Sequence, residues 1–224
     1  MRVSEDRLTL LKVEDSEIDE HGTLWEEIPR TVTHIGDSAF ERCSSLKNLT
    51  LPAGITHIDG YAFSGCFSLI NLTLPAGLTH IGDAAFYNCN SLINLTLPAG
   101  ITHIGNQAFS DCRSLINLTL PAGITHINGY AFSDCDSLIN LTLPAGLTHI
   151  GNQAFGRCNN LKNIIIDSND DAEVEQIRAL LPADIQNKVI KKSFIAEIEK
   201  NIKQALKALT VEPKTMQSFH LTLE

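Results

Sequence analysis

The sequence lacks any apolar run long enough to cross a membrane, for which a helix needs about 18 or more consecutive apolar residues. It also lacks a surplus of basic residues, because 17 Lys and Arg stand against 26 Asp and Glu. A nucleic-acid-binding surface needs a basic stripe that neutralises phosphates, so the composition predicts no nucleic-acid partner. The first residues contain no apolar signal segment. We therefore expect a chain that is secreted or translocated without a cleavable N-terminal signal, or else a cytoplasmic one.

What the sequence does contain is a strict period of 23 residues. Phenylalanines from Phe40 to Phe155 and histidines from His34 to His149 recur at this step. A fixed period in this range indicates one supersecondary unit stacked coil on coil, in which neighbouring coils bury one another's apolar side chains. The cysteines keep the same step and are Cys43, Cys66, Cys89, Cys112, Cys135 and Cys158.

Each coil has a pattern of its own. Leu72-Thr73-Leu74 alternates apolar and polar residues, which predicts a short strand with its leucines pointing inward. Pro75 then ends the strand, because proline cannot donate to a continuing ladder. The apolar spacing between Tyr61 and Cys66 predicts a single helical or 3₁₀ turn.

The string L-x-x-L-x-L-P-x-x-[IL]-x-x-I-G-x-x-A-F-x-x-C recurs in register from about residue 32 to residue 166. It resembles the treponemal-type, or BspA-like, leucine-rich repeat of bacterial proteins. This resemblance implies an α/β repeat fold, a right-handed leucine-rich-repeat solenoid with parallel strands on its concave face. Asp59 and Asn128 stand where the pattern has Gly. Both residues tolerate left-handed backbone, so we expect the turn to persist there.

The two ends of the chain differ from the middle and predict three parts. Residues 1–31 form an N-terminal cap with a degenerate first coil, residues 32–166 form the solenoid, and residues 167–224 form a C-terminal helical cap and tail. In the N-terminal cap, residues 7–13 and 22–28 flank an acidic stretch. This arrangement predicts a hairpin laid over the open end of the first coil.

The C-terminal part predicts two helices. Residues 168–171 offer N-cap oxygens for a first helix that stops near Pro182. A second helix has lysines on one face and, on the other, Ile185, Val189, Ile195, Ile198, Ile202, Leu206 and Leu209. This helix could trail from the cap, or it could dock onto a second protein or a second copy. We expect a monomer, in which the second helix is the part that could mediate dimerisation.

Cysteine and histidine columns are the candidates for chemistry. One thiol per coil, without any C-x-x-C, predicts reduced core thiols that serve packing alone and a reducing compartment. Each histidine follows a threonine and precedes an inward isoleucine, so it should point outward. Such a ladder presents its ligands in parallel, whereas zinc needs converging ones. We therefore predict no metal site, no cofactor and no catalytic residue, and we expect that the chain is not an enzyme.

The predicted binding surface follows the strand column. One isoleucine per coil precedes the strand, and a stack of them would form an apolar stripe at the surface. Strand parity offers the alternative that these isoleucines belong to the core, if the strand begins early. The candidate partner-binding residues are Ile70, Ile93, Ile116, Ile139, Asn71, Asn94, Asn117, Thr73, Thr96, Thr119, Phe67 and Arg113.

Two functions remain open. The resemblance implies a curved, non-enzymatic scaffold for protein–protein interaction, and within that class a bacterial effector that acts on a host protein. The alternative is a surface-exposed adhesive or structural repeat protein. Under the first hypothesis the chain is secreted or translocated into a host cell, and otherwise it stays in the bacterial cytoplasm.

Overall fold

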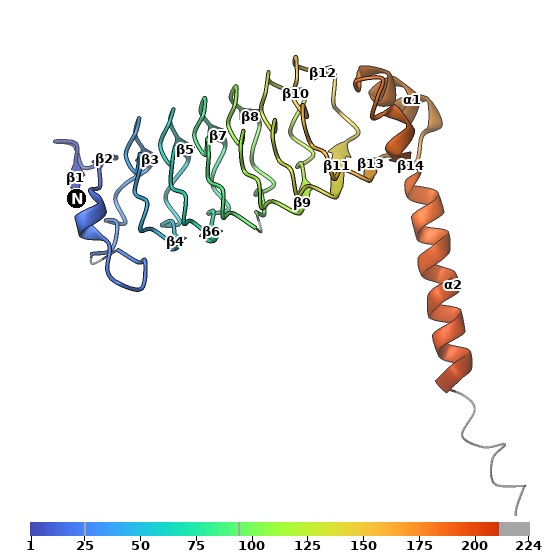
Figure 1. The fold of residues 1–224 in the computed structure, drawn as a ribbon, viewed down its shortest axis with the longest axis horizontal. Coiled ribbons are helices and arrows are strands. Elements are labelled where there is room, and N and C mark those ends of the chain that lie inside the picture. The colour runs from blue at the N-terminus through green and yellow to red at the C-terminus, as the bar shows by residue number, and fades with distance from the viewer. Residues whose placement is uncertain (25, 94, 211–224) are drawn as a thin grey trace, which may run out of the picture.

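The computed structural model describes residues 1–24, 26–93 and 95–210. They form a solenoid that runs from an N-terminal cap to a C-terminal helical region (Figure 1). The predicted repeat fold with parallel strands is therefore confirmed. Each coil contributes to two columns of short strands, one beginning with histidine and one beginning with asparagine.

In both columns paired strands run parallel with a register of 23 residues, as in His34 with His57 and Asn48 with Asn71, and the histidine column is interrupted between His103 and His126. The strands of the histidine column are β3 (His34–Ile35), β5 (His57–Ile58), β7 (His80–Ile81), β8 (His103–Ile104), β10 (His126–Ile127) and β12 (His149–Ile150). The strands of the asparagine column are β4 (Asn48–Thr50), β6 (Asn71–Thr73), β9 (Asn117–Thr119), β11 (Asn140–Pro144) and β13 (Asn163–Asp167).

Phenylalanine rings form the spine of the core. The rings of Phe40 and Phe63 stack with centroids 4.7 Å apart, and the series continues to Phe132 and Phe155 at 5.7 Å. Inward-facing leucines, isoleucines and cysteines surround the rings and are buried with them. Burying one such ring stabilises the fold by about 1.5–3 kcal/mol, so the regular stack is a main source of stability.

The cysteine thiols are buried, but they do more than pack. The Sγ of Cys66 donates to the carbonyl oxygen of Phe40 in the preceding coil at 3.1 Å, and Cys89 bonds Phe63 in the same way at 3.2 Å. The same contact recurs at each later cysteine. The prediction that the thiols serve packing alone was therefore incomplete, because each thiol also satisfies a backbone acceptor inside the core.

The prediction of a left-handed turn at Asp59 and Asn128 was wrong in position. The left-handed residues lie two positions later, as at Tyr61 with φ 53° and Tyr130 with φ 57°. The glycine usual at the slot of Asp59 and Asn128 serves a different need. A Cβ at Gly105 would lie 2.5 Å from the backbone nitrogen of Asp83, so glycine here permits close approach of the preceding coil.

The N-terminal cap contains an antiparallel hairpin, but it lies earlier in the chain than predicted. β1 (Arg2–Val3) pairs with β2 (Thr9–Lys12), and β2 pairs in parallel with β3. After the 3₁₀ helix η1 (Asp15–Glu17), residues 22–24 return to the asparagine side, where the carbonyl of Gly22 accepts from Lys47 N at 2.8 Å. Residues 9–24 and 26–28 thus build an irregular extra coil that covers the open core.

The C-terminal cap begins with helix α1 (Asp171–Leu180), whose N-cap Asp170 accepts a hydrogen bond from Ala172 N at 2.7 Å. The second predicted helix starts later than expected. Residues from Ile185 instead enter the 3₁₀ helix η2 (Gln186–Lys188) and the strand β14 (Val189–Ile190), which extends the sheet beside β13. Helix α2 (Lys192–Thr210) follows.

Helix α2 leaves the solenoid at a steep angle to its long axis (Figure 1). Ion pairs tie its start to the cap: Lys192 to Asp167 at 2.5 Å, and the preceding Lys191 to Asp171 at 2.7 Å. The predicted tail beyond residue 210 lies outside the described residues. Across the described part of the chain, α2 included, no helix has the length and apolarity that a membrane crossing requires.

Candidate functional site

The isoleucines that precede the asparagine column lie on the surface and form an isoleucine stripe, which we define as Ile70, Ile93, Ile116 and Ile139. Ile70, Ile93 and Ile116 are each 36% exposed, and Ile139 is half-buried. The alternative that these side chains belong to the core is therefore wrong.

The point at which each strand begins explains this placement. β6 starts at Asn71, so Ile70 precedes the ladder and sits at the corner of the coil, while Leu69 and Leu72 on either side point inward. The corners still stack in register, because Ile139 N donates to the carbonyl of Ile116 at 2.8 Å. Backbone pairing thus holds the isoleucines in one line.

An asparagine ladder runs beside the stripe. The side-chain Nδ2 of Asn71 donates to Oδ1 of Asn48 at 2.7 Å, and the same bond joins Asn140 to Asn117 and Asn163 to Asn140. Thr73, Thr96 and Thr119 are exposed on the same face, two residues further along. Asn94, the remaining predicted member, lies outside the described residues. The face therefore offers an apolar line next to a line of amides and hydroxyls.

A groove of about 440 Å³ lies along the C-terminal half of the stripe. Its walls combine apolar, hydroxyl and amide groups with one cation, and they are formed by Ile93, Ser114, Ile116, Ser137, Ile139, Asn160 and Lys162. The serines were not among the predicted site residues. The serine column two residues before the stripe repeats at the same step as the isoleucines and could have identified them.

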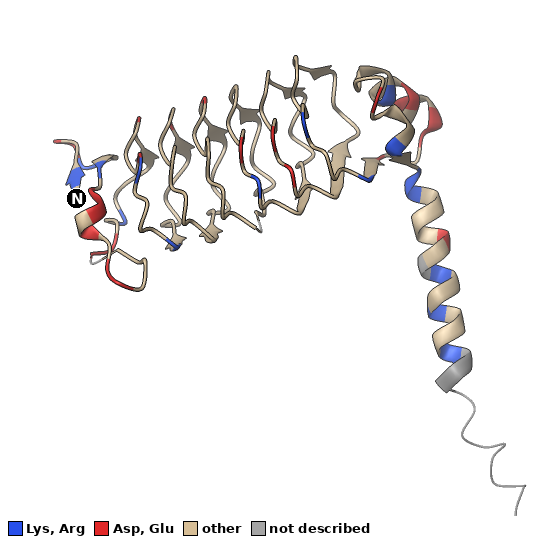
Figure 2. Ribbon diagram, in the orientation of Figure 1, with Lys and Arg blue, Asp and Glu red and all other residues tan. Residues whose placement is uncertain are grey.

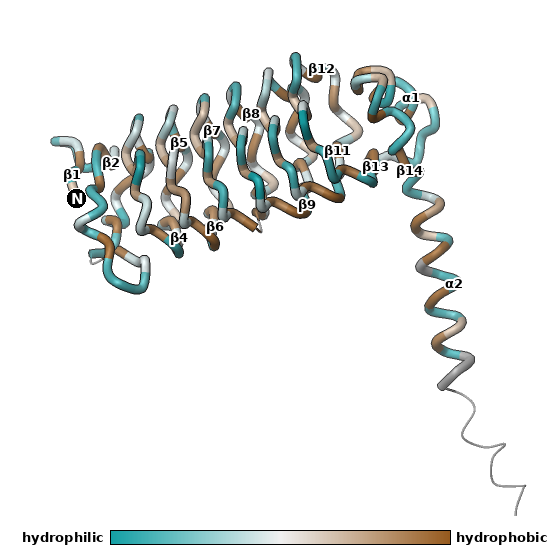
Figure 3. Tube along the Cα trace, in the orientation of Figure 1, coloured by the Kyte–Doolittle hydropathy of each residue, from teal (hydrophilic) through white to brown (hydrophobic). Residues whose placement is uncertain are grey.

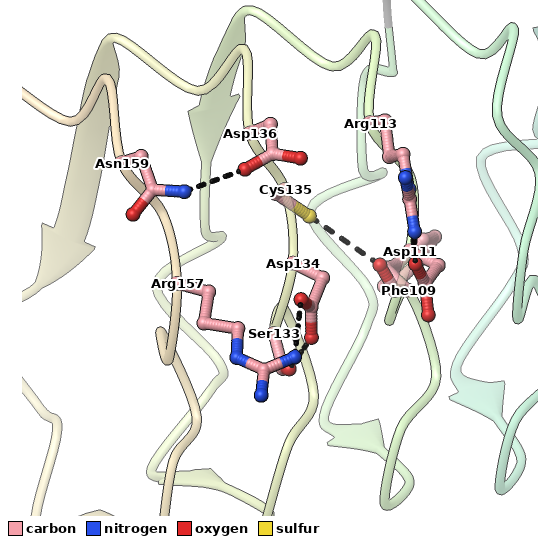
Figure 4. Close-up of polar contacts among 9 residues, drawn as sticks. All are labelled: Phe109, Asp111, Arg113, Ser133, Asp134, Cys135, Asp136, Arg157 and Asn159. Carbon is pink, nitrogen blue, oxygen red and sulfur yellow. Dashed lines mark hydrogen bonds and ion pairs between the residues drawn. The ribbon is translucent and has the colours of Figure 1, made fainter.

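Phe67 and Arg113 lie on the turn that leads into the stripe, and both are exposed. The Arg113 guanidinium binds the carboxylate of Asp111 in its own coil at 2.8 Å. In the next two coils the contacts cross between coils (Figure 4): Arg157 to Asp134 at 3.4 Å, and Asn159 to Asp136 at 2.9 Å. Solvent screens exposed pairs of this kind, so they contribute little to stability.

Charge is sparse along the solenoid (Figure 2), and apolar residues gather on the edge that carries β4, β6 and β9 (Figure 3). The stripe is bounded by Lys47 at one end and by Lys162 at the other, and both lysines are exposed. The stripe is thus an apolar line that ends in a cation on each side.

The histidines lie on another side of the coil. The rings of His34 and His57 stack at 4.5 Å, and those of His80 and His103 at 4.3 Å. Burial lowers the pKa of His80, and the neighbouring His103 and His57 lower it further. Within the described ranges no three or more metal-ligating side chains converge on one point.

Comparison with known families places the fold. A family model described as the BspA type leucine rich repeat region, in 6 copies, matches residues 25–112 and 79–202, which together cover well over half of the chain. The chain belongs to this family. Leucine-rich repeat proteins are generally non-enzymatic scaffolds and typically bind proteins. No curated protein matches the chain.

Several solved structures of bacterial proteins resemble this one. The T. pallidum leucine rich repeat protein is 30% identical, with a TM-score of 0.61 over 68% of this chain and 78% of that one. A leucine-rich repeat protein from Bacteroides ovatus is 25% identical, with a TM-score of 0.51 over 74% of this chain and 49% of that one. The pneumococcal vaccine antigen PcpA is 21% identical and shares the fold, with a TM-score of 0.62 over 84% of this chain and 44% of that one. This chain therefore spans about half, or less, of the length of the last two.

Proposed function

We propose that the chain is a protein–protein interaction scaffold and that the isoleucine stripe is its binding surface. The observation that carries the proposal is the line of isoleucines held at the surface in register, each 36% exposed at Ile70, Ile93 and Ile116. A contiguous line of exposed apolar side chains usually marks a surface that another molecule covers. The groove beside Lys162 adds a position for an acidic group of the partner.

The partner that fits this surface is a protein segment with apolar side chains along one face and a carboxylate near one end. We further propose that this partner belongs to a host cell and that the chain acts there as a bacterial effector. The alternative setting is a bacterial surface, where the repeats would act as an adhesive or structural element. In both settings the stripe is the surface that makes the contact.

The test is a comparative capture experiment with the full chain as bait. Ile93→Thr combined with Ile116→Thr replaces the centre of the stripe with smaller, polar side chains that keep the branch at Cβ. The matched control is His126→Asn combined with His149→Asn, on another side of the same solenoid. Host-cell and bacterial lysates are used in parallel, and the captured proteins are identified by mass spectrometry.

The proposal expects host proteins that bind the chain and the histidine variant but are lost from the isoleucine variant. Partners that bind both variants equally would rule out the stripe as the binding surface. Partners found only in the bacterial lysate would overturn the effector role and favour the structural one.

A further inference from the structure

Besides the histidine and asparagine columns, a third column of backbone hydrogen bonds joins neighbouring coils. It lies on the turns that carry the left-handed residues, and we call it the turn column. Between two central coils its bonds, all at 2.8 Å, are Ala84 N to Asn106 O, Phe86 N to Ala108 O and Asn88 N to Ser110 O. The same set recurs at every step from the coil of Ser38 to the coil of Gln153, so the turn column is unbroken.

The asparagine column, in contrast, is open in the middle of the solenoid. β6 and β9 belong to different sheets, and residues 95–97 between them lie in no strand. A groove of about 450 Å³ lies at this opening, with walls from residues 95–99 and 117–122. The strand sequence Leu-Thr-Leu-Pro is the same here as in the neighbouring coils, so the opening comes from how the coils stack and not from a local change of residues.

The amide of Leu97 shows the opening at a single bond. In the next coil Leu120 N donates to Thr142 O at 3.0 Å. The equivalent acceptor for Leu97 N is Thr119 O, but Leu97 N bonds no acceptor among the residues that the structure describes. The strand of residues 95–97 is therefore not tied to the coil that follows it.

The histidine column is open between the same two coils. β8 ends one sheet and β10 begins another. Thr56 N donates to Thr33 O at 2.8 Å, whereas the equivalent N–H of Thr125 has no acceptor in the described part of the chain. Two of the three hydrogen-bonded columns are thus interrupted at one interface, between residues 93–112 and residues 116–135.

The turn column holds this interface together on its remaining side. Gln107 N donates to Gly129 O at 3.0 Å, and the rings of Phe109 and Phe132 stack beside it with centroids 5.4 Å apart. An interface that is bonded along one side only can open and close about that side, because few hydrogen bonds must break.

We propose that this interface is a joint, at which the N-terminal and C-terminal halves of the solenoid bend about the turn column. The isoleucine stripe crosses the joint between Ile93 and Ile116. The bond from Ile116 N to Ile93 O is 3.4 Å long there, against 2.8 Å for the bond from Ile139 N to Ile116 O. Bending therefore changes the spacing of the stripe.

A partner that lies along the stripe would select one bend of the solenoid, because it binds one spacing of the isoleucines better than the others. This consequence rests on the proposed function, whereas the joint itself does not. The experiments below accordingly use the free chain, so their outcome is independent of any partner.

Amide hydrogen exchange of the wild-type chain, resolved by residue with NMR, tests the opening. The repeat supplies matched controls, because Leu97 and Leu120 both stand in Thr-Leu-Pro and Thr125 and Thr56 both stand in Ile-Thr-His. Identical neighbours give identical intrinsic rates. We expect Leu97 and Thr125 to exchange at least about tenfold faster than Leu120 and Thr56. Equal rates within each pair would overturn the proposal.

Distances between spin labels test the bending. The native thiols are buried, so labels attach to added cysteines. Thr50→Cys with Thr142→Cys places the labels on the asparagine column, and Tyr61→Cys with Gln153→Cys places them on the turn column. Both pairs are 92 residues apart and span the joint, with an expected separation of about 19 Å from the coil spacing.

The proposal expects a broader distribution of distances for the pair on the asparagine column than for the pair on the turn column. Distributions of equal width would show that the two halves do not bend about the turn column, and would overturn the joint even if the amides of Leu97 and Thr125 exchange fast.

Discussion

The side-chain amide of Asn128 donates to the carbonyl of Ile104 at 2.8 Å, in a place where other coils use a backbone N–H. Gly105 N bonds Ile81 O at 2.8 Å, and Gly151 N bonds Ile127 O at 2.7 Å. The asparagine side chain therefore replaces the backbone donor. The histidine column is divided at this point, since β8 ends one sheet and β10 begins another. Asp59 occupies the same slot but keeps the backbone bond, from its N–H to the carbonyl of Ile35 at 2.8 Å, and the ladder continues past it, so the interruption is specific to Asn128.

Gly151→Ala should destabilise the solenoid by about 1–3 kcal/mol through overpacking. The added Cβ would lie 2.5 Å from the backbone nitrogen of Gly129 and 2.7 Å from the carbonyl carbon of Asn128. Gly146→Ala in the same coil is the control, because its nearest neighbour is 3.9 Å away. Urea denaturation followed by circular dichroism measures both. Equal stabilities for the two variants would contradict the role assigned to close approach.

Cys112→Ser should cost about 1–2 kcal/mol and no more than Cys112→Ala. The Sγ of Cys112 lies 3.4 Å from the carbonyl oxygen of Phe86, so a serine hydroxyl finds the same acceptor. Alanine lacks a donor and removes a similar volume. The free energies of unfolding of both variants, measured by chemical denaturation, decide the matter. A serine variant that is clearly less stable than the alanine variant would mean that the thiol makes no useful hydrogen bond.

Stability should fall as the pH drops through about 6.5, the ordinary pKa of histidine. Burial lowers the pKa of His80 in the folded state, and His103 and His57 add to this effect, whereas Asp59 and Asp83 act in the opposite direction. Below an unfolded value of about 6.5, the unfolded chain therefore binds a proton that the folded chain resists. The free energy of unfolding then decreases as the pH falls.

His80→Asn should reduce this dependence, and His126→Asn is the control, which should retain most of it. Melting temperatures of the three proteins, recorded across the same pH range, provide the measurement. A wild-type melting temperature that rises on acidification would show that the sign is wrong.

The variants Ile116→Ala and Leu115→Ala truncate neighbouring residues, of which Ile116 lies at the surface and Leu115 in the core. Leu115 is buried, so its truncation should cost about 2–5 kcal/mol. Ile116 is already 36% exposed, and its truncation should cost roughly 1 kcal/mol. Thermal denaturation of the two variants is sufficient. Similar losses of stability in the two variants would mean that the isoleucines are part of the core. The proposed binding surface would then have no basis.

The repeat architecture could be predicted because most coils repeat the same bonds at the same step, as in Thr56 N to Thr33 O at 2.8 Å. The residues of the stripe could be predicted from the sequence, but whether they lie at the surface or in the core could not. Its exposure depends on whether the strand begins at Ile70 or at Asn71, and the alternation of side chains alone allows both. The structure decides it at the corner of the coil, where β6 starts at Asn71.

The left-handed positions could not be predicted from residue type. Tyr61 and Ala84 adopt them with φ 53° and 51°, although neither residue favours this region. Contacts between coils impose the conformation: Tyr61 N donates to Asp83 O at 2.9 Å, and Ala84 N donates to Asn106 O at 2.8 Å. The position of the N-terminal hairpin was predicted wrongly, because residues 1–31 carry no repeat that fixes their pairing.

Because the thiols are buried, free cysteines in this chain do not by themselves indicate a reducing compartment. Disulfide formation starts from a thiolate, and burial raises the pKa of Cys43 and of Cys158 to about 12, with the thiols between them shifted in the same direction. While the solenoid is folded, almost none of these thiols is therefore present as the thiolate that disulfide formation requires. After prolonged exposure to air and then denaturation, thiol titration should still count all 6 cysteines as free. A folded chain could thus pass from a reducing cytoplasm to an oxidising medium with its core chemistry unchanged.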